Sequence, residues 1–162
     1  MTQALYRYAT EADVPAILDL IRQLAEYEKA ADQVVATEEL LRQSLFEQRA
    51  AEVLLVEANG RPVGFAVFFT SFSTWLGRAG GFLEDLFVLP DERGKGYGKG
   101  LLQRLAQIAV ERGYGRLEWN CLDWNQPSID FYLSLEAAPM DCWTTYRLEG
   151  DTLEALAAQP LR

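Results

Sequence analysis

The sequence predicts a mixed α/β protein folded as a single domain over residues 1–162. Two β-rich runs are joined by Asn59-Gly60, the dipeptide most typical of a tight hairpin. The apolar run FLEDLFVLP leads directly into the glycine-rich stretch RGKGYGKG, which a helical pattern and then another strand-like run follow. This order predicts an antiparallel first half and a strand-helix-strand unit in the second half.

Hydrophobic spacing and helix caps predict the elements of the first half. Residues 5–9 alternate in polarity and predict a strand, and Thr10 opens the next helix with the capping box T-E-A-D. Apolar residues then recur at helical spacing from Ile17 to Ala25. Thr37 opens a second helix over EELLRQSLF, and VLLVEANGRPVGFAVFF supplies the two strands of the hairpin.

The second half begins with an expected loop over TSFSTWLGRAGG and a strand over residues 82–89. A helix over GLLQRLAQIAVERG ends at Gly113, as left-handed caps commonly do. A strand over residues 115–122 and a short helix from near Pro127 or Ser128 come next. The strand-like WTTYRL and one or two helical turns in DTLEALAAQ complete the prediction.

Composition excludes several classes of function. The chain has no histidine and two cysteines, so no zinc or other metal site is expected, and no histidine-activated nucleophile is available. A formal net charge of -9 argues against nucleic acid as a partner and favours cationic ligands. No apolar run approaches the roughly 20 residues that span a bilayer, and the polar start lacks a signal peptide. We therefore expect a cytoplasmic protein with no membrane partner.

The stretch RGKGYGKG predicts an anion site, because it joins the carboxyl end of a strand to the amino end of a helix. Its glycines let the backbone bend, and Arg93, Lys95 and Lys99 add mobile positive charge. The triphosphate-loop pattern fails because Lys99 precedes Gly100 rather than Ser or Thr. The dinucleotide pattern G-x-G-x-x-G also fails. What remains is R-G-K-G-Y-G on a strand-to-helix turn.

That pattern resembles the acetyl-CoA pyrophosphate loop of the GNAT superfamily of N-acetyltransferases. The resemblance spans nearly the whole chain, and LAEYE, LEDLFV and WNQPSIDFY are similar to stretches of the diamine (spermidine/spermine) and thialysine acetyltransferases. It implies a GNAT-type fold, with a central, mostly antiparallel twisted sheet of about six to seven strands and helices on both faces. It also implies a homodimer that uses acetyl-CoA.

The resemblance implies acetyl transfer to a primary amine of a small molecule, such as a diamine, thialysine or an amino-acid-like amine, by direct attack in a ternary complex. Two alternatives stay open: acetylation of a protein amino terminus or lysine, and a non-catalytic acyl-CoA-binding sensor. Thr144 and Thr145 replace acidic residues of the polyamine-specific relatives, which makes spermidine and spermine less suitable acceptors. Glu136 stands where relatives carry a glycine, at a position suited to a left-handed helix cap.

Two acids interrupt the apolar strand at Glu84 and Asp85. Strict alternation places Glu84 on one face with Phe82, Leu86 and Val88, and Asp85 on the other with Leu83 and Phe87. At least one carboxylate therefore needs a partner or a function, unless the strand is an edge with both acids hydrated. By resemblance, Glu84 contacts the amine and passes its proton to solvent through water.

Further site residues are implied by the resemblance. Tyr27, Glu28 and Asp85 join Glu84 in binding the substrate, although Glu28 could also be an exposed charge at a helix end. Trp75 could border the amine pocket or simply pack. Tyr132 matches the general acid that protonates the departing thiolate, with core packing as its alternative. The residues expected to bind the cofactor are Leu86, Phe87, Val88, Arg93, Gly94, Lys95, Gly96, Tyr97, Gly98, Lys99, Asn125, Ser128 and Tyr132.

Overall fold

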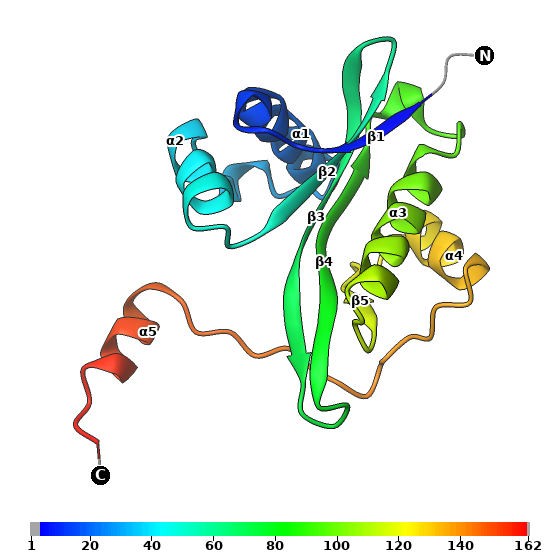
Figure 1. The fold of residues 1–162 in the computed structure, drawn as a ribbon. Coiled ribbons are helices and arrows are strands. Elements are labelled where there is room, and N and C mark those ends of the chain that lie inside the picture. Colours follow the sequence, from blue (N-terminus) through cyan, green and yellow to red (C-terminus); the bar gives the residue numbers. More distant parts are fainter. Residues whose placement is uncertain (1–3, 162) are drawn as a thin grey trace. The chain divides into compact units, whose positions relative to one another are not determined.

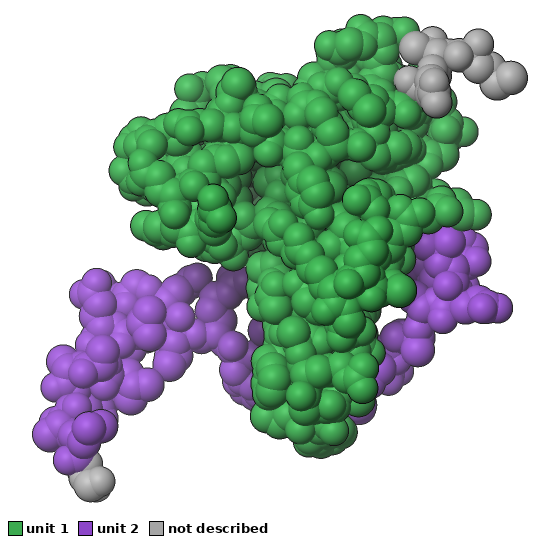
Figure 2. All heavy atoms as spheres, viewed as in Figure 1, with its two compact units in different colours: residues 1–120 green, residues 121–162 purple. Residues whose placement is uncertain are grey.

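The structure, a computed structural model, describes residues 4–161 in two compact units (Figure 2), shown in green for residues 1–120 and in purple for residues 121–162. The single domain over residues 1–162 stays a prediction. Within residues 4–161, the helices are all too short or too polar to cross a membrane.

The first unit is built on one five-stranded sheet in the order β1-β2-β3-β4-β5 (Figure 1). Neighbouring strands are antiparallel from β1 to β4, whereas β5 runs parallel to β4. The mixed sheet of the prediction is thus confirmed, with five strands rather than six or seven. The strands are β1 (Leu5–Tyr8), β2 (Glu52–Ala58), β3 (Arg61–Ser73), β4 (Arg78–Val88) and β5 (Leu117–Trp119).

One face of the sheet carries α1 (Val14–Tyr27) and α2 (Glu38–Arg42). Apolar side chains at helical spacing along α1 pack against β2, β3 and β4 and exclude water from this face. Thr37 caps α2 as predicted, since its hydroxyl oxygen accepts a hydrogen bond of 3.2 Å from the Leu40 amide. The core on this face contains Ile17, Leu20, Leu24, Val53, Leu55, Phe65 and Phe87.

The opposite face carries α3 (Tyr97–Glu111), which contacts β1 to β4. Apolar residues at helical spacing along α3, namely Leu101, Leu102, Leu105 and Ile108, are buried. At the far end of α3, the Arg112 guanidinium makes two hydrogen bonds to the Glu52 carboxylate, of 2.6 and 2.8 Å. Paired hydrogen bonds between a planar guanidinium and a carboxylate are stronger than ordinary hydrogen bonds, so this pair holds the end of α3 against the sheet.

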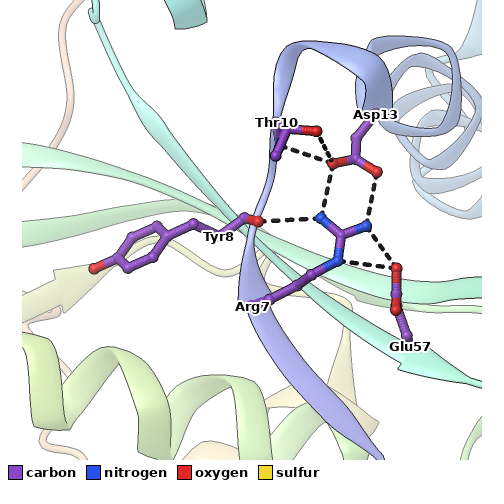
Figure 3. A network of polar contacts seen from close by, with 5 residues as sticks. All are labelled: Arg7, Tyr8, Thr10, Asp13 and Glu57. Carbon is purple, nitrogen blue, oxygen red and sulfur yellow. Dashed lines mark hydrogen bonds and ion pairs between the residues drawn. The ribbon is translucent and has the colours of Figure 1, made fainter.

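An ion network joins β1, β2 and the start of the first helix (Figure 3). Arg7 binds both carboxylate oxygens of Asp13 at 2.8 Å and also binds Glu57. The backbone N–H of Thr10 donates to Asp13 at 2.7 Å, and the hydrogen bonds from Arg7 hold the pKa of Asp13 below its usual range. The predicted capping box is therefore present, and Asp13 also fixes the direction in which the chain leaves β1.

The hairpin of β3 and β4 is longer than predicted. Its strands pair as far as Ser73 and Arg78, so most of the predicted loop TSFSTWLGRAGG is strand. Gly80 and Gly81, which fall in the expected loop, allow close packing within the sheet. A Cβ on Gly80 would lie 3.1 Å from the carbonyl oxygen of Arg116, and a Cβ on Gly81 would lie 3.0 Å from the Leu117 side chain.

The second unit contains α4 (Gln126–Ser134) and α5 (Gly150–Ala157), close to the two helices predicted there. The stretch WTTYRL, residues 143–148, forms no strand in this unit, contrary to prediction. A strand needs a neighbour to pair its backbone groups, and the described part of the second unit offers none. This stretch accounts for part of the difference in strand number.

Candidate active site

The glycine-rich loop has the backbone geometry of an anion site. Gly94 and Gly96 have φ angles of 77° and 83°, in the left-handed region that side chains rarely adopt, and Gly96 caps α3. The first hydrogen bond of α3 runs from the Gly100 amide to the Gly96 carbonyl, at 2.9 Å. The amides before Gly100 therefore have no acceptor inside the helix and are available to bind an anion at its positive end.

Two of the three cations expected to surround the anion have partners within the protein. Lys95 binds the carboxylate of Glu92 at 2.7 Å, and Arg61 binds the same group at 3.1 Å. Arg93 donates from Nε to the Val88 carbonyl at 3.0 Å. Lys99 is the remaining cation, and its exposed side chain makes no ion pair with another residue in the range 4–161.

A β-bulge lies at Glu84, in the middle of β4. Val67 is opposite Asp85, but the next residue of β3, Phe68, is opposite Leu83, so Glu84 is an extra residue. The bulge puts Leu83 and Asp85 on opposite faces, because Val67 and Phe68 are neighbours on one strand. Strict alternation had predicted that Leu83 and Asp85 share a face, which is wrong. Leu83 instead packs on the side of Phe68, in the core beneath α3.

The bulge also marks the point where β4 loses a neighbour. The pairing of β4 with β5 covers Gly81 to Leu83 and stops before Glu84. Beyond it, no strand in the described part of the first unit pairs with the second edge of β4. Leu86, Phe87 and Val88, which were expected to bind the cofactor, lie on this open segment. Its backbone groups can pair with an extended chain that carries amides.

An acidic cluster lies on the α1 side of the bulge. Asp85 is half-buried, and burial, with smaller effects from Glu84 and then Glu28, raises its pKa to about 6. Burial also raises the pKa of Glu28, at the end of α1. Glu84 itself is exposed. The structure thus brings together three predicted substrate residues, from α1 and β4, in a place that a cation would stabilise.

Tyr27 lies beside the acidic cluster, at the end of α1. Its ring packs against the core beneath α1, and the guanidinium carbon of Arg93 lies 4.7 Å from the ring centre. Lys29, two residues after Tyr27, has a φ angle of 59° and reverses the chain at the end of α1. The backbone of this turn, closed by a 2.8 Å hydrogen bond from Ala30 to Ala25, holds Tyr27 and Glu28 in place.

Trp75 is not brought to the carboxylates within the first unit. It lies in the turn between β3 and β4, and its side chain is 85% exposed. Asp85 is seven residues beyond the start of β4 at Arg78, a distance of about 23 Å along an extended strand. A substrate role for Trp75 stays a prediction.

The three candidate residues of the second unit are ordered around α4. The side-chain oxygen of Asn125 accepts a hydrogen bond of 3.4 Å from the Ser128 amide, so Asn125 is the N-cap of α4, and it is buried. Ser128 and Tyr132 are four residues apart and share a face of the helix. The Tyr132 ring is half-buried and lies 5.4 Å from that of Phe131. The acid role of Tyr132 stays a prediction.

Sequence reasoning missed two residues that shape the loop. Glu92 is buried and holds Lys95, and the spacing of three between these residues was a readable signal. Tyr6, on β1, packs so closely on α3 that a Cβ at Gly100 would lie 2.0 Å from its hydroxyl oxygen. No signal in the sequence connects Tyr6 with Gly100.

Comparison with known proteins agrees with this geometry. Residues 16–136 match the model of the acetyltransferase (GNAT) family. A thialysine N-epsilon-acetyltransferase of Bos taurus is 38% identical over 173 residues, covering 98% of this chain and 100% of the relative. An L-ornithine N5-acetyltransferase of Arabidopsis thaliana is 32% identical over 196 residues, covering 93% of this chain and 86% of the relative.

A solved structure supports the fold. An aminoglycoside N-acetyltransferase in complex with CoA superposes with a TM-score of 0.73 at 17% identity, over 93% of this chain and 97% of that one. With the family match over most of the chain and full-length relatives above 30% identity, the chain belongs to the acetyltransferase (GNAT) family and is an N-acetyltransferase, similar to the thialysine N-epsilon-acetyltransferases.

Proposed function

We propose that the enzyme transfers the acetyl group of acetyl-CoA to a primary amine of a small, amino-acid-like molecule or diamine, by direct attack in a ternary complex. The observation that carries this proposal is the acidic cluster of half-buried Asp85 and Glu28 with exposed Glu84, at the bulge where β4 opens. Acidic side chains at the open strand suit a cationic acceptor next to an extended, amide-bearing cofactor.

The carboxylates have a definite chemical task. An alkyl amine with a pKa of about 10.4 is an ammonium ion at pH 7, and freeing its lone pair costs about 4 to 5 kcal/mol. Asp85 and Glu28 hold the ammonium group by charge. Glu84, the exposed residue of the bulge, takes the proton and passes it to solvent through water.

The loop and the open strand fit acetyl-CoA. Its diphosphate needs several N–H donors and positive charge, and α3 offers the amides of Tyr97, Gly98 and Lys99 together with the Lys99 side chain. The backbone of Leu86 to Val88 offers donors and acceptors for the amides of the pantetheine arm, although the Val88 carbonyl already accepts a hydrogen bond from Arg93. When bound, acetyl-CoA supplies the acetyl group as a thioester.

Proton transfer completes the reaction. A carbon–nitrogen bond forms as the amine attacks, the carbon–sulfur bond breaks, and the amine proton leaves through Glu84. Tyr132 donates a proton to the departing thiolate and regains one from solvent. No covalent enzyme intermediate is needed, since a deprotonated amine attacks a thioester readily once it is positioned.

The relatives suggest the kind of amine. Thialysine and L-ornithine, in the names of the two relatives above, both carry a side-chain amine on an amino acid. Thr144 and Thr145 offer no charge for a second ammonium group of a polyamine. We therefore propose a thialysine-like or ornithine-like acceptor ahead of spermidine and spermine. We also propose that the enzyme is a cytoplasmic homodimer.

Two measurements test this function in sequence. Thermal unfolding is followed with CoA, ATP or NAD, because a ligand at about 100 times its Kd adds roughly 2.7 kcal/mol to the free energy of unfolding. Only CoA is expected to raise the Tm. Thiol release from acetyl-CoA is then measured with thialysine, ornithine, putrescine, spermidine and peptides. Stabilisation by CoA with no release for any amine would favour a sensor, and release with peptides alone a protein acetyltransferase.

A further inference from the structure

Arg93 begins the glycine-rich loop, and its exposed side chain contacts β4 and the end of α1. Its Nε donates to the Val88 carbonyl at 3.0 Å. The guanidinium carbon lies 4.7 Å from the centre of the Tyr27 ring and 5.5 Å from that of Phe87. Three separate contacts thus fix one side chain, from the carboxyl end of β4 and from the end of α1.

These contacts join the two elements that carry the acidic cluster. Phe87 lies on the same face of β4 as Asp85, because they pair with Phe65 and Val67 of β3. Tyr27 directly precedes Glu28, whose charge reaches Asp85. Arg93 therefore bridges the end of α1 to β4 beside the pair of carboxylates. A loss of this bridge frees the end of α1 to move relative to Asp85.

The other cations of the loop differ from Arg93. Lys95 is bound to Glu92, while Lys99 is exposed in the first turn of α3. Lys99 thus supplies charge to the anion without bridging two elements of the fold. This difference makes Lys99 a matched comparison for Arg93, since each contributes one positive charge to the same loop.

We propose that Arg93 is a positioning residue for the amine acceptor, which sets the spacing between Glu28 and Asp85 by clamping Tyr27 to the end of β4. The proposal rests on the function proposed above. It gives Arg93 a role in binding the amine substrate. The position of Arg93 at the start of the loop would instead suggest a role in binding the diphosphate of CoA.

The conservative variant Arg93→Lys separates the two assignments. Lysine keeps the charge but lacks both Nε and the flat guanidinium that covers Tyr27. We expect Arg93→Lys to raise the KM for thialysine about tenfold and to leave the KM for acetyl-CoA within about twofold. Lys99→Gln is expected to raise the KM for acetyl-CoA about tenfold and to leave the KM for thialysine within about twofold. If thialysine is not acetylated, the panel amine with the highest turnover takes its place.

A double-mutant cycle tests whether Arg93 acts through Tyr27. Tyr27→Leu removes the ring, so Arg93→Lys in that background should change the amine KM by less than about twofold. Additive effects, an unchanged amine KM in Arg93→Lys, or a rise in the acetyl-CoA KM like that of Lys99→Gln would each overturn the role of Arg93. A wild-type protein that acetylates no amine would instead overturn the proposed function itself.

Discussion

The fold changes the acid–base chemistry of Asp85. On an exposed strand it would titrate near pH 4, but burial and the two neighbouring glutamates raise its pKa to about 6. A carboxyl group with this pKa changes charge within the pH range in which enzyme kinetics can be measured. Its protonation state therefore becomes a measurable part of amine binding.

We predict that kcat/KM for the amine falls as the pH drops below about 6, because Asp85 then loses the charge that holds the ammonium group. Asp85→Asn should remove this dependence and lower kcat/KM at pH 7.5 by about 10- to 100-fold, the usual value of a charged hydrogen bond. Asp91→Asn, an exposed change of the same charge, is the control. An unaltered pH profile in Asp85→Asn would show that another group controls binding.

Glu136 carries a cost that a single substitution can remove. It adopts a φ angle of 61° after α4, at the position where relatives carry a glycine suited to a left-handed cap. The structure shows the left-handed geometry, so the penalty is present. Glu136→Gly should raise the free energy of unfolding by about 1 kcal/mol, measured by urea denaturation. Ser134→Gly, inside α4, should lower it by about 0.5 kcal/mol; equal effects of the two changes would contradict this reading.

Among the elements, α3 depends on how closely it approaches β1. The amide donors of the anion site lie in its first turn, and Tyr6 of β1 packs against that turn at Gly100. The other end of α3 is fastened by Arg112 and Glu52. The position of the anion site relative to the sheet is therefore set by contacts at both ends of one helix.

We predict that Gly100→Ala destabilises the protein, although alanine favours helices by about 1 kcal/mol over glycine. The new Cβ would meet the Tyr6 side chain and push the first turn of α3 away, so the Kd for CoA should also rise. Without the Tyr6 ring, the effect of Gly100→Ala on stability should change sign: in a Tyr6→Leu background, Gly100→Ala should raise the Tm. Calorimetry measures both effects, and destabilisation in the two backgrounds alike would rule out this contact as the cause.

Across the whole molecule, local signals predicted what depends on neighbours in the sequence. Asn59-Gly60 forms the expected hairpin, with φ angles of 54° and 73°. The cap at Thr37 and the left-handed glycines before α3 were likewise readable, because each follows from the conformation that a residue type allows. The family's motifs suggested the remaining candidate site residues by resemblance, and their roles stay predictions.

Features that depend on distant residues could not be predicted. The bulge at Glu84 adds one residue to β4, and alternation in a single strand cannot show an insertion relative to its partner. The side chain of Arg93 was expected to be mobile, but it contacts the ring of Tyr27 from α1. This contact exists only once β4 and α1 have come together in the fold.

Identification of the acetylated product tests the central claim most directly. The enzyme is mixed with thialysine and acetyl-CoA carrying an isotope label in the acetyl group, and the products are analysed by mass spectrometry. We predict labelled acetyl on the side-chain amine of thialysine, formed in equal amount with free CoA thiol. Label found only in free acetate, or thiol release that no amine in the panel stimulates, would contradict the assignment.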